Sequence, residues 1–467
     1  MLALAVLVAL FHVVEDTRGK RAWEQHKREC AARGEDIGDW QSLIPPPIPD
    51  EDNVAMAPIF QDLLAKPARR WVHLPSPQRI TPHTNTVSGT RWQTGVNYGL
   101  DHWRVALSND NLLVALAFWD DDLREIEEAL KRPLFRHEEW DKMPADFFPN
   151  VVIAVGESLT RIYHLWSMAR LEEGQTSDAL EDIKTGFRVA NMDLSAPLTI
   201  AVIVRSSFLD MMLVPVWAGI HGQAWDAQQL AELQGVLEDI NLVEHLVRAN
   251  KFDTRWCANL LISAPRPKIL DQIKILASFS SSTDAETREF LAGIMPRGWF
   301  YQNALHYARL YDNINAAIHA DDRWLDIPQI KRIYTANEES EWTAYSFLVG
   351  TFQSMGFSYV KKPANTQATL HQAVIACAIE RYRLEHGRIP ERLGDLVPTY
   401  LAKIPSDPCD GQPMRYKPEG DGNAVIYSIG INGVDDGGQF GVKKMKGADV
   451  VDIDSGDWIW RVITSGE

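Results

Sequence analysis

Cysteine is scarce in this chain of 467 residues, and the spacing of the few that occur is uninformative for metal binding. The four are Cys30, Cys257, Cys377 and Cys409. No two form a CxxC pair, which argues against a structural zinc site of the finger or ribbon type. Cys377 lies on an apolar helical pattern and is expected to be a small core residue. Whether it pairs with Cys409 is left open by the sequence.

Catalytic motifs are also missing. The chain has no GxSxG elbow, no phosphate-binding GxxxxGK[ST] loop and no dinucleotide-binding GxGxxG. His137-Glu138-Glu139 begins like HExxH, but no second histidine follows at the required place. Scattered single histidines on helical patterns are typical of packing groups. The sequence therefore names no reaction.

Positive charge is in the minority, with a net charge of −16 and no cluster of Lys or Arg. Nucleic-acid binding needs such a cluster to neutralise phosphates, so a nucleic-acid partner is excluded. The acidity is compatible with simple solubility or with divalent cations.

The N-terminal residues 1–14 are almost wholly apolar. As a helix they span ~21 Å, less than the ~30 Å hydrocarbon core of a bilayer. No basic residue precedes them, while Arg18, Lys20 and Arg21 follow, which is the opposite of a signal peptide. We interpret the segment as a membrane anchor, truncated by an internal start at Met1. Taken literally, the basic residues that follow the segment place the body of the protein in the cytoplasm. The alternative to an anchor is that residues 1–14 form a buried core helix.

The rest of the chain divides into four parts. Residues 15–53 are predicted to form a stalk and a Pro-rich linker, because the prolines of 44–53 cannot be helical. Residues 54–108 read as irregular, with short strands near 70–73 and 91–98. Residues 109–356 read as an all-α body of packed helical hairpins, in which 263–297 is helix-poor. Residues 362–467 form a small C-terminal domain.

Two helical segments need separate interpretation. Residues 151–190 resemble one tetratricopeptide-type hairpin, with a turn at 172–179 that contains Gly174. No repeat period follows, so a solenoid is not supported. The apolar run 198–217 is interrupted by Arg205 and Asp210 and is expected to be a core helix rather than a membrane span.

Aromatic and amide side chains gather in the block 298–313. Trp299, Tyr301, Tyr307 and Tyr311 recur close to helical spacing. They either line a ligand or peptide groove or pack between helices.

The C-terminal part carries the most specific pattern. A helix is expected up to His386, with Gly387 as its C-cap and Pro390 blocking continuation. A hairpin is expected over 415–430, with its turn at 419–422.

Four segments of this part resemble the C-terminal head of the major pseudopilins of type II secretion systems. They are Ala378–Tyr382, His386–Pro390, Ile404–Pro408 and Tyr427–Gly430, followed by an acidic Gly-rich loop. The resemblance covers about the last hundred residues and implies an extracytoplasmic location. It departs from the family because no processed leader is present and Glu15 follows the apolar stretch, so assembly into a filament is not expected. The whole chain also resembles uncharacterised bacterial envelope proteins that join a helical body to such a tail.

The resemblance further implies a calcium ion in the acidic loop. The ligands it implies are Asn432, Asp435, Asp436, Asp454 and Asp457, since calcium takes six to eight oxygen ligands. Asp449 and Asp452 lie on the same return segment. The alternative is a solvated acidic turn.

The sequence therefore predicts an α+β protein with a mostly helical body and a small head of one helix and an antiparallel hairpin. The predicted function is a membrane-tethered, extracytoplasmic binding or scaffold protein with a protein partner and a calcium-stabilised head. The alternatives are an enzyme with a site near 299–313 and a cytoplasmic helical adaptor.

Overall fold

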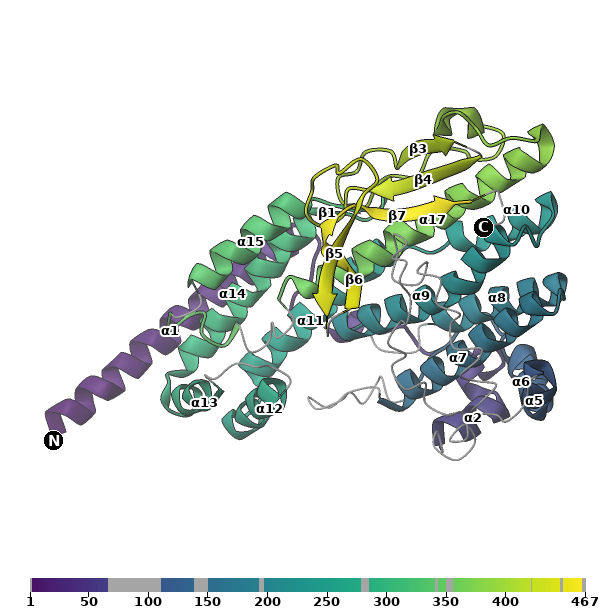
Figure 1. The fold of residues 1–467 in the computed structure, drawn as a ribbon. Helices are drawn as coiled ribbons and strands as arrows, with labels where there is room; N and C mark the ends of the chain where they lie inside the picture. The colour runs from purple at the N-terminus through teal and green to yellow at the C-terminus, as the bar shows by residue number, and fades with distance from the viewer. Residues whose placement is uncertain are drawn as a thin grey trace.

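The computed structural model describes residues 2–65, 111–137, 150–192, 197–278, 285–340, 343–349, 356–420, 422–445 and 448–463. Over these residues the chain is mostly helical and carries a few small antiparallel sheets, which confirms the α+β class (Figure 1). The short strands expected near 70–73 and 91–98 lie outside the described residues.

The predicted anchor and the start of the predicted stalk form one continuous helix, α1 (Leu2–Ala32). Its outer end projects from the rest of the molecule (Figure 1). Its inner part lies along α14 (Arg297–Ala316) and buries one face, made of residues three or four positions apart: Glu15, Gly19, Trp23, His26 and Cys30. This spacing is the one that places side chains on the same side of a helix.

After α1 come three short 3₁₀ turns, which span Gln41–Leu43, Asp50–Asp52 and Val54–Met56. The helices that follow are α2 (Pro58–Ala65), α5 (Leu112–Leu116), α6 (Asp120–Ala129), α7 (Asn150–Glu172), α8 (Thr176–Asn191), α9 (Thr199–His221), α10 (Ala227–Glu238) and α11 (Leu242–Ser263). Another 3₁₀ turn, Ala117–Trp119, joins α5 to α6. The expected hairpin is α7–α8, whose turn contains Gly174 at a φ of 72°.

The prediction of a helix-poor connection over 263–297 is wrong, because α12 (Arg266–Ser278) and α13 (Ala285–Ile294) occupy much of it. Pro267 lies in the first turn of α12 and Pro296 immediately precedes α14. Proline is tolerated there because the first N–H groups of a helix have no partner within the helix. A small hairpin of β1 (Ile318–His319) and β2 (Trp324–Leu325) then leads to α15 (Ile327–Ser340).

Among the described helices, α9 is long and apolar enough to cross a membrane, but more than half of its apolar stretch is buried in the fold. It packs against α7, α8, α11 and α17 (Ser358–His386). This environment is that of a core helix, as the interrupting charges indicate.

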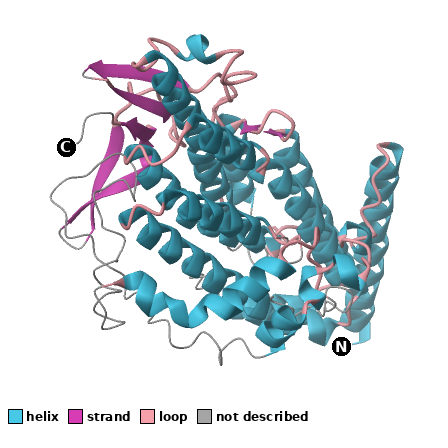
Figure 2. Cartoon of the chain, turned by 90° about the vertical axis from the view of Figure 1, so that its right-hand side faces the viewer, coloured by secondary structure: helices cyan, strands magenta, loops and turns pink. Residues whose placement is uncertain are grey.

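The C-terminal part is built on α17, which ends at Gly387 with a φ of 71°, as expected of a glycine C-cap. A 3₁₀ turn, Leu393–Leu396, follows. The strands β3 (Arg415–Gly420), β4 (Asn423–Ser428) and β7 (Trp458–Val462) form an antiparallel sheet in the order β3-β4-β7. A second hairpin pairs β5 (Phe440–Met445) with β6 (Ala448–Gly456). The strands gather on one side of the helices (Figure 2).

The middle of α17, over residues 366–380, is covered on all sides. Every residue from Thr366 to Glu380 is buried, and the helix contacts both the sheet and helices α9, α10 and α11. One hydrophobic cluster accordingly contains residues from Ile44 through α7–α10 to α17 and Val462. The core therefore crosses the predicted boundary between body and C-terminal domain. Cys377 and Cys409 are both buried, and both are free thiols.

Candidate functional site

The structure places four of the five predicted calcium ligands around the loop that joins β4 to β5. Asp457 is buried, and its carboxylate accepts the N–H of Asp436 (3.2 Å) and of Gly438 (2.7 Å). Its own N–H donates to the carbonyl of Gln439. Burial raises the pKa of the Asp457 carboxyl, while the two backbone N–H groups oppose that rise. Asp457 thus holds the loop in shape through backbone hydrogen bonds.

Three other predicted ligands, Asn432, Asp435 and Asp436, lie on the same loop. The Asn432 amide donates to the Asp436 carboxylate at 3.2 Å. Asp435 accepts the N–H of Gly437 and the Nε of Arg415. Three predicted ligands therefore lie on this loop and Asp457 lies against it, although each carboxylate already has a donor from the protein.

Asp454 does not join this group. It lies on β6 and pairs with Lys361 of α17, and its second oxygen is 3.9 Å from Lys443. Its neighbours Asp449 and Asp452 pair with Lys444 and Lys443. The calcium site remains a prediction, and the residues brought together for it are Asn432, Asp435, Asp436 and Asp457.

The Ile404–Pro408 motif provides a buried hydrogen-bond centre next to this loop. Asp407 is 0% exposed. Its Oδ1 accepts from Ser428 Oγ (2.6 Å) and Cys409 N, and its Oδ2 accepts from Ile429 N and Arg415 (2.8 Å). Arg415 also reaches Asp410 and Asp435. The motif thus ties the loop before β3 to the end of β4, where the acidic loop begins.

A second polar region lies beside the N-terminal helix. A cavity of about 660 Å³ is bounded mainly by α1, α11 and α14 and the turn after α1. Its charged and imidazole side chains are His26, Glu29, Arg33, Glu35, Lys251, Arg255, Arg309 and Asp312. A smaller cavity of about 410 Å³ lies between α14 and α15, where His306 Nε2 is 2.9 Å from Asn337 Oδ1.

The aromatic block 298–313 supplies both packing and cavity surface. Tyr307 and Tyr311 are buried against each other, with ring centroids 4.7 Å apart. The intervening polar residues His306, Arg309 and Asp312 face the two cavities. Helix packing and a ligand groove are the two alternatives that the sequence leaves open for this block. One face of α14 packs in the core, and another face lines the two cavities.

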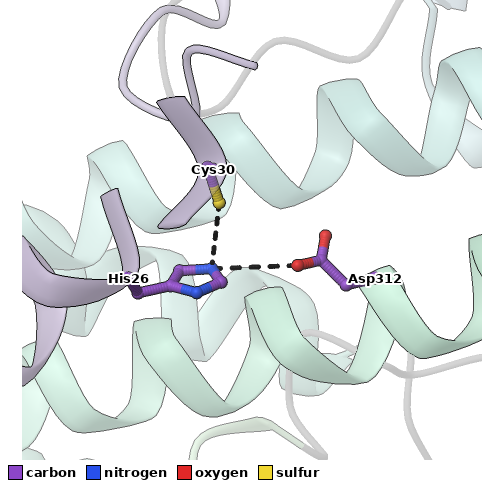
Figure 3. Close-up of side chains that lie close together, drawn as sticks. All are labelled: His26, Cys30 and Asp312. Carbon is purple, nitrogen blue, oxygen red and sulfur yellow. Dashed lines mark hydrogen bonds and ion pairs between the residues drawn. The ribbon is translucent and has the colours of Figure 1, made fainter. Parts of the chain in front are cut away.

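Three potential metal ligands meet at the larger cavity (Figure 3). His26 and Cys30 come from α1 and Asp312 from α14. His26 Nε2 lies 3.6 Å from Cys30 Sγ and 4.0 Å from Asp312 Oδ2. Among the residues that the structure describes, this is the set of His, Cys, Asp and Glu whose ligand atoms all lie within 4.8 Å of one another.

The surroundings of these side chains set their protonation. Burial lowers the pKa of His26, and the nearby Asp312 only partly opposes this. Burial raises the pKa of the Cys30 thiol, with Asp312 adding to the rise and Arg33 opposing it. Arg33 donates to Cys30 Sγ (3.3 Å) and to Asp312 Oδ2 (3.1 Å).

CxxC spacing, the pattern typical of structural zinc sites, gives no sign of this group. His26 and Cys30 are four residues apart, a spacing that places both on one face of a helix. That signal was present in the sequence. Asp312 had no such signal, because only the docking of α14 on α1 brings it near.

Comparisons of the chain with protein-family models, with curated proteins and with solved structures find no match.

Proposed function

We propose that this chain is a membrane-tethered, extracytoplasmic binding or scaffold protein of a bacterial secretion or envelope system, with a calcium-stabilised head. The observation that carries the proposal is the exposure of the outer end of α1. Leu2 is 83% exposed and Val13 63%, and the apolar residues between them are exposed on all sides of the helix. They are Leu4, Val6, Leu7, Val8, Leu10 and Phe11.

An apolar surface of this kind is unfavourable in water. Successive residues of a helix point about 100° apart, so these positions cover its whole circumference. A hydrocarbon environment matches such a surface, whereas a partner helix would cover one stripe of it.

The apolar segment is joined rigidly to the body. Immediately after it, Glu15 accepts hydrogen bonds from Trp299 Nε1 and from the Tyr345 hydroxyl, both at 3.0 Å. Asp16 accepts the N–H of Gly298 at 2.7 Å. Tryptophan and tyrosine at the end of an apolar helix are typical of the membrane–water interface. These contacts support a tether that holds the body close to a bilayer.

The extracytoplasmic side, the protein partner and the calcium ion rest on the resemblance of the C-terminal residues to pseudopilin heads. The helix α17, the antiparallel strands and the acidic loop held by Asp457 support that interpretation.

Cell fractionation of a bacterium that makes the full chain tests the tether. The wild type is expected in the membrane fraction. The double variant Leu7→Asp with Phe11→Asp should be released, because each charge strongly disfavours insertion. Val114→Asp, at an exposed apolar residue of α5, is the control and should stay with the membrane. Wild-type protein in the soluble fraction would contradict the anchor.

Protease added to intact spheroplasts tests the side. Degradation of the body supports an extracytoplasmic location. Protection until the cells are lysed would place the body in the cytoplasm and favour the helical adaptor.

A further inference from the structure

We propose that His26, Cys30 and Asp312 bind a transition-metal ion of the zinc class, with one coordination position open to the cavity between α1, α11 and α14. The inference does not depend on the membrane tether or on calcium in the head.

The first support is the set of donor atoms. An imidazole nitrogen, a thiolate sulfur and a carboxylate oxygen suit zinc and its neighbours, whereas calcium and magnesium take oxygen ligands. Zinc binds such atoms at roughly 2.0–2.3 Å, so neighbouring ligands lie roughly 3.3–3.8 Å apart in a tetrahedral site. His26 Nε2 lies 3.6 Å from the sulfur and 4.0 Å from the carboxylate oxygen, close to this range, and all three ligand atoms lie within 4.8 Å of one another.

The second support is that two rigid elements hold the donors in place. His26 and Cys30 are one helical turn apart on the buried face of α1, and they are 2% and 1% exposed. Asp312 extends from α14 toward them, as Figure 3 shows. The position of α1 on α14 is fixed by direct backbone contact at Gly19 and Gly298. Ligands positioned in this way lose little conformational freedom on binding an ion.

The third support comes from the groups around the three ligands. The other ring nitrogen of His26, Nδ1, lies 3.8 Å from the Glu29 carboxylate. A carboxylate on that side of a metal-bound histidine orients the ring and makes it a better ligand.

Arg33 is the competitor for this position. Its guanidinium contacts Cys30 Sγ and Asp312 Oδ2, the same atoms that a metal ion would take. The side chain is 51% exposed and lies 3.7 Å from Glu35, so it has room to turn away. The Arg33 guanidinium would repel a metal ion bound to the same two ligand atoms. Removing the charge of Arg33 should therefore strengthen metal binding.

Three protein ligands leave a fourth position, as in catalytic zinc sites that hold a water molecule or a ligand. Here it faces the cavity, whose walls carry the cations Lys251, Arg255 and Arg309. The open position therefore suits water or a small anion.

Cobalt(II) titration of the metal-free, reduced full chain tests the proposal, because a thiolate bound to Co²⁺ gives a charge-transfer absorption band. The wild type should show this band, saturate at one equivalent and lose it when Zn²⁺ is added. Cys30→Ser should abolish the band. Cys257→Ser, at another buried thiol of the same hydrophobic cluster, should retain it.

Two further variants complete the test. Asp312→Asn, at a partly exposed side chain, should weaken Co²⁺ binding by about tenfold or more. Arg33→Gln should tighten it. The proposal is overturned if neither the wild type nor Arg33→Gln shows the band, or if the band survives in a folded Cys30→Ser protein. Circular dichroism establishes that each variant is folded.

Discussion

Gly19 of α1 and Gly298 of α14 face each other so closely that a Cβ on Gly19 would lie 2.1 Å from the carbonyl oxygen of Gly298. A Cβ on Gly298 would lie 2.0 Å from the carbonyl oxygen of Glu15. The two helices therefore touch backbone to backbone, with no side chain between them. This approach lets Asp16 accept the N–H of Gly298, in the first turn of α14, at 2.7 Å.

Gly19→Ala is expected to destabilise the fold by about 1–3 kcal/mol, because the added methyl group forces the two backbones apart. Urea denaturation measures the loss. Gly235→Ala is the matched control, since Gly235 lies within α10 and a Cβ there meets nothing within 4 Å. It should stabilise the protein by about 0.5–1 kcal/mol through helix propensity. Equal effects of the two substitutions would contradict the close contact.

Acid should destabilise the fold through His371 of α17. Its Nδ1–H donates to the Ser406 carbonyl (2.7 Å), and its Nε2 accepts from the Gln367 amide (3.0 Å). Gln367 in turn accepts the N–H of Leu242 at the start of α11. Burial lowers the pKa of His371 to about 4, because a charged ring would lose solvent and could no longer accept from Gln367.

The folded state favours the neutral form of His371, so protonation of this ring destabilises the fold. Stability from this group is fully present above the unfolded pKa of 6.5 and is lost as pH falls toward 4, by up to about 3 kcal/mol. His164, whose pKa burial also lowers to about 4, adds in the same direction. Urea midpoints at several pH values between 7.5 and 4 measure the loss. His371→Gln should flatten the dependence, whereas His386→Gln at the exposed end of α17 should not, and equal slopes in both variants would refute the assignment.

Asp407→Asn is expected to cost about 3 kcal/mol, since it removes the buried carboxylate that pairs with Arg415. Asp410 also pairs with Arg415 but is partly exposed, so Asp410→Asn should cost under about 1 kcal/mol. Chemical denaturation of both variants gives the comparison. A similar small loss in each would mean that Asp407 does not organise the loop.

Calcium should raise the melting temperature of the full chain relative to EDTA, and magnesium should not. Asp436→Ala should remove the rise, because Asp436 lies on the acidic loop with Asn432 and its carboxylate is one of the predicted ligands. Asp454→Asn should leave the rise intact, since Asp454 pairs with Lys361 away from that loop. No rise in the wild type would reduce the loop to a solvated acidic turn.

Local patterns predicted much of the fold. Helical periodicity and Gly174 gave the α7–α8 hairpin, and Gly387 gave the end of α17. Prolines misled the interpretation of 263–297, because a proline at the start of a helix and one in a loop look alike in sequence. All of these predictions, correct or wrong, rest on residues that lie within one or two helical turns of each other along the chain.

The candidate sites depend on longer distances. The resemblance implies that Asp454 and Asp457 bind one ion, yet Asp454 pairs with Lys361, on a helix that the sequence could not place beside β6. Asp312 likewise reaches His26 only through the packing of α14 on α1. Tertiary packing decides both contacts, and neither the composition of the chain nor the spacing of its residues predicts that packing.

The burial of the middle of α17 on every side has a consequence for how the chain is made. Residues of α7–α10 share one hydrophobic cluster with α17, β4 and β7, so much of the core consists of residues that are synthesised well after the body helices. A nascent chain that lacks them leaves the apolar faces of α9 and α10 open to water, and the contacts that close them span long sequence separations. The helical body is therefore expected to complete its core only once α17 and the strands that follow it have been synthesised.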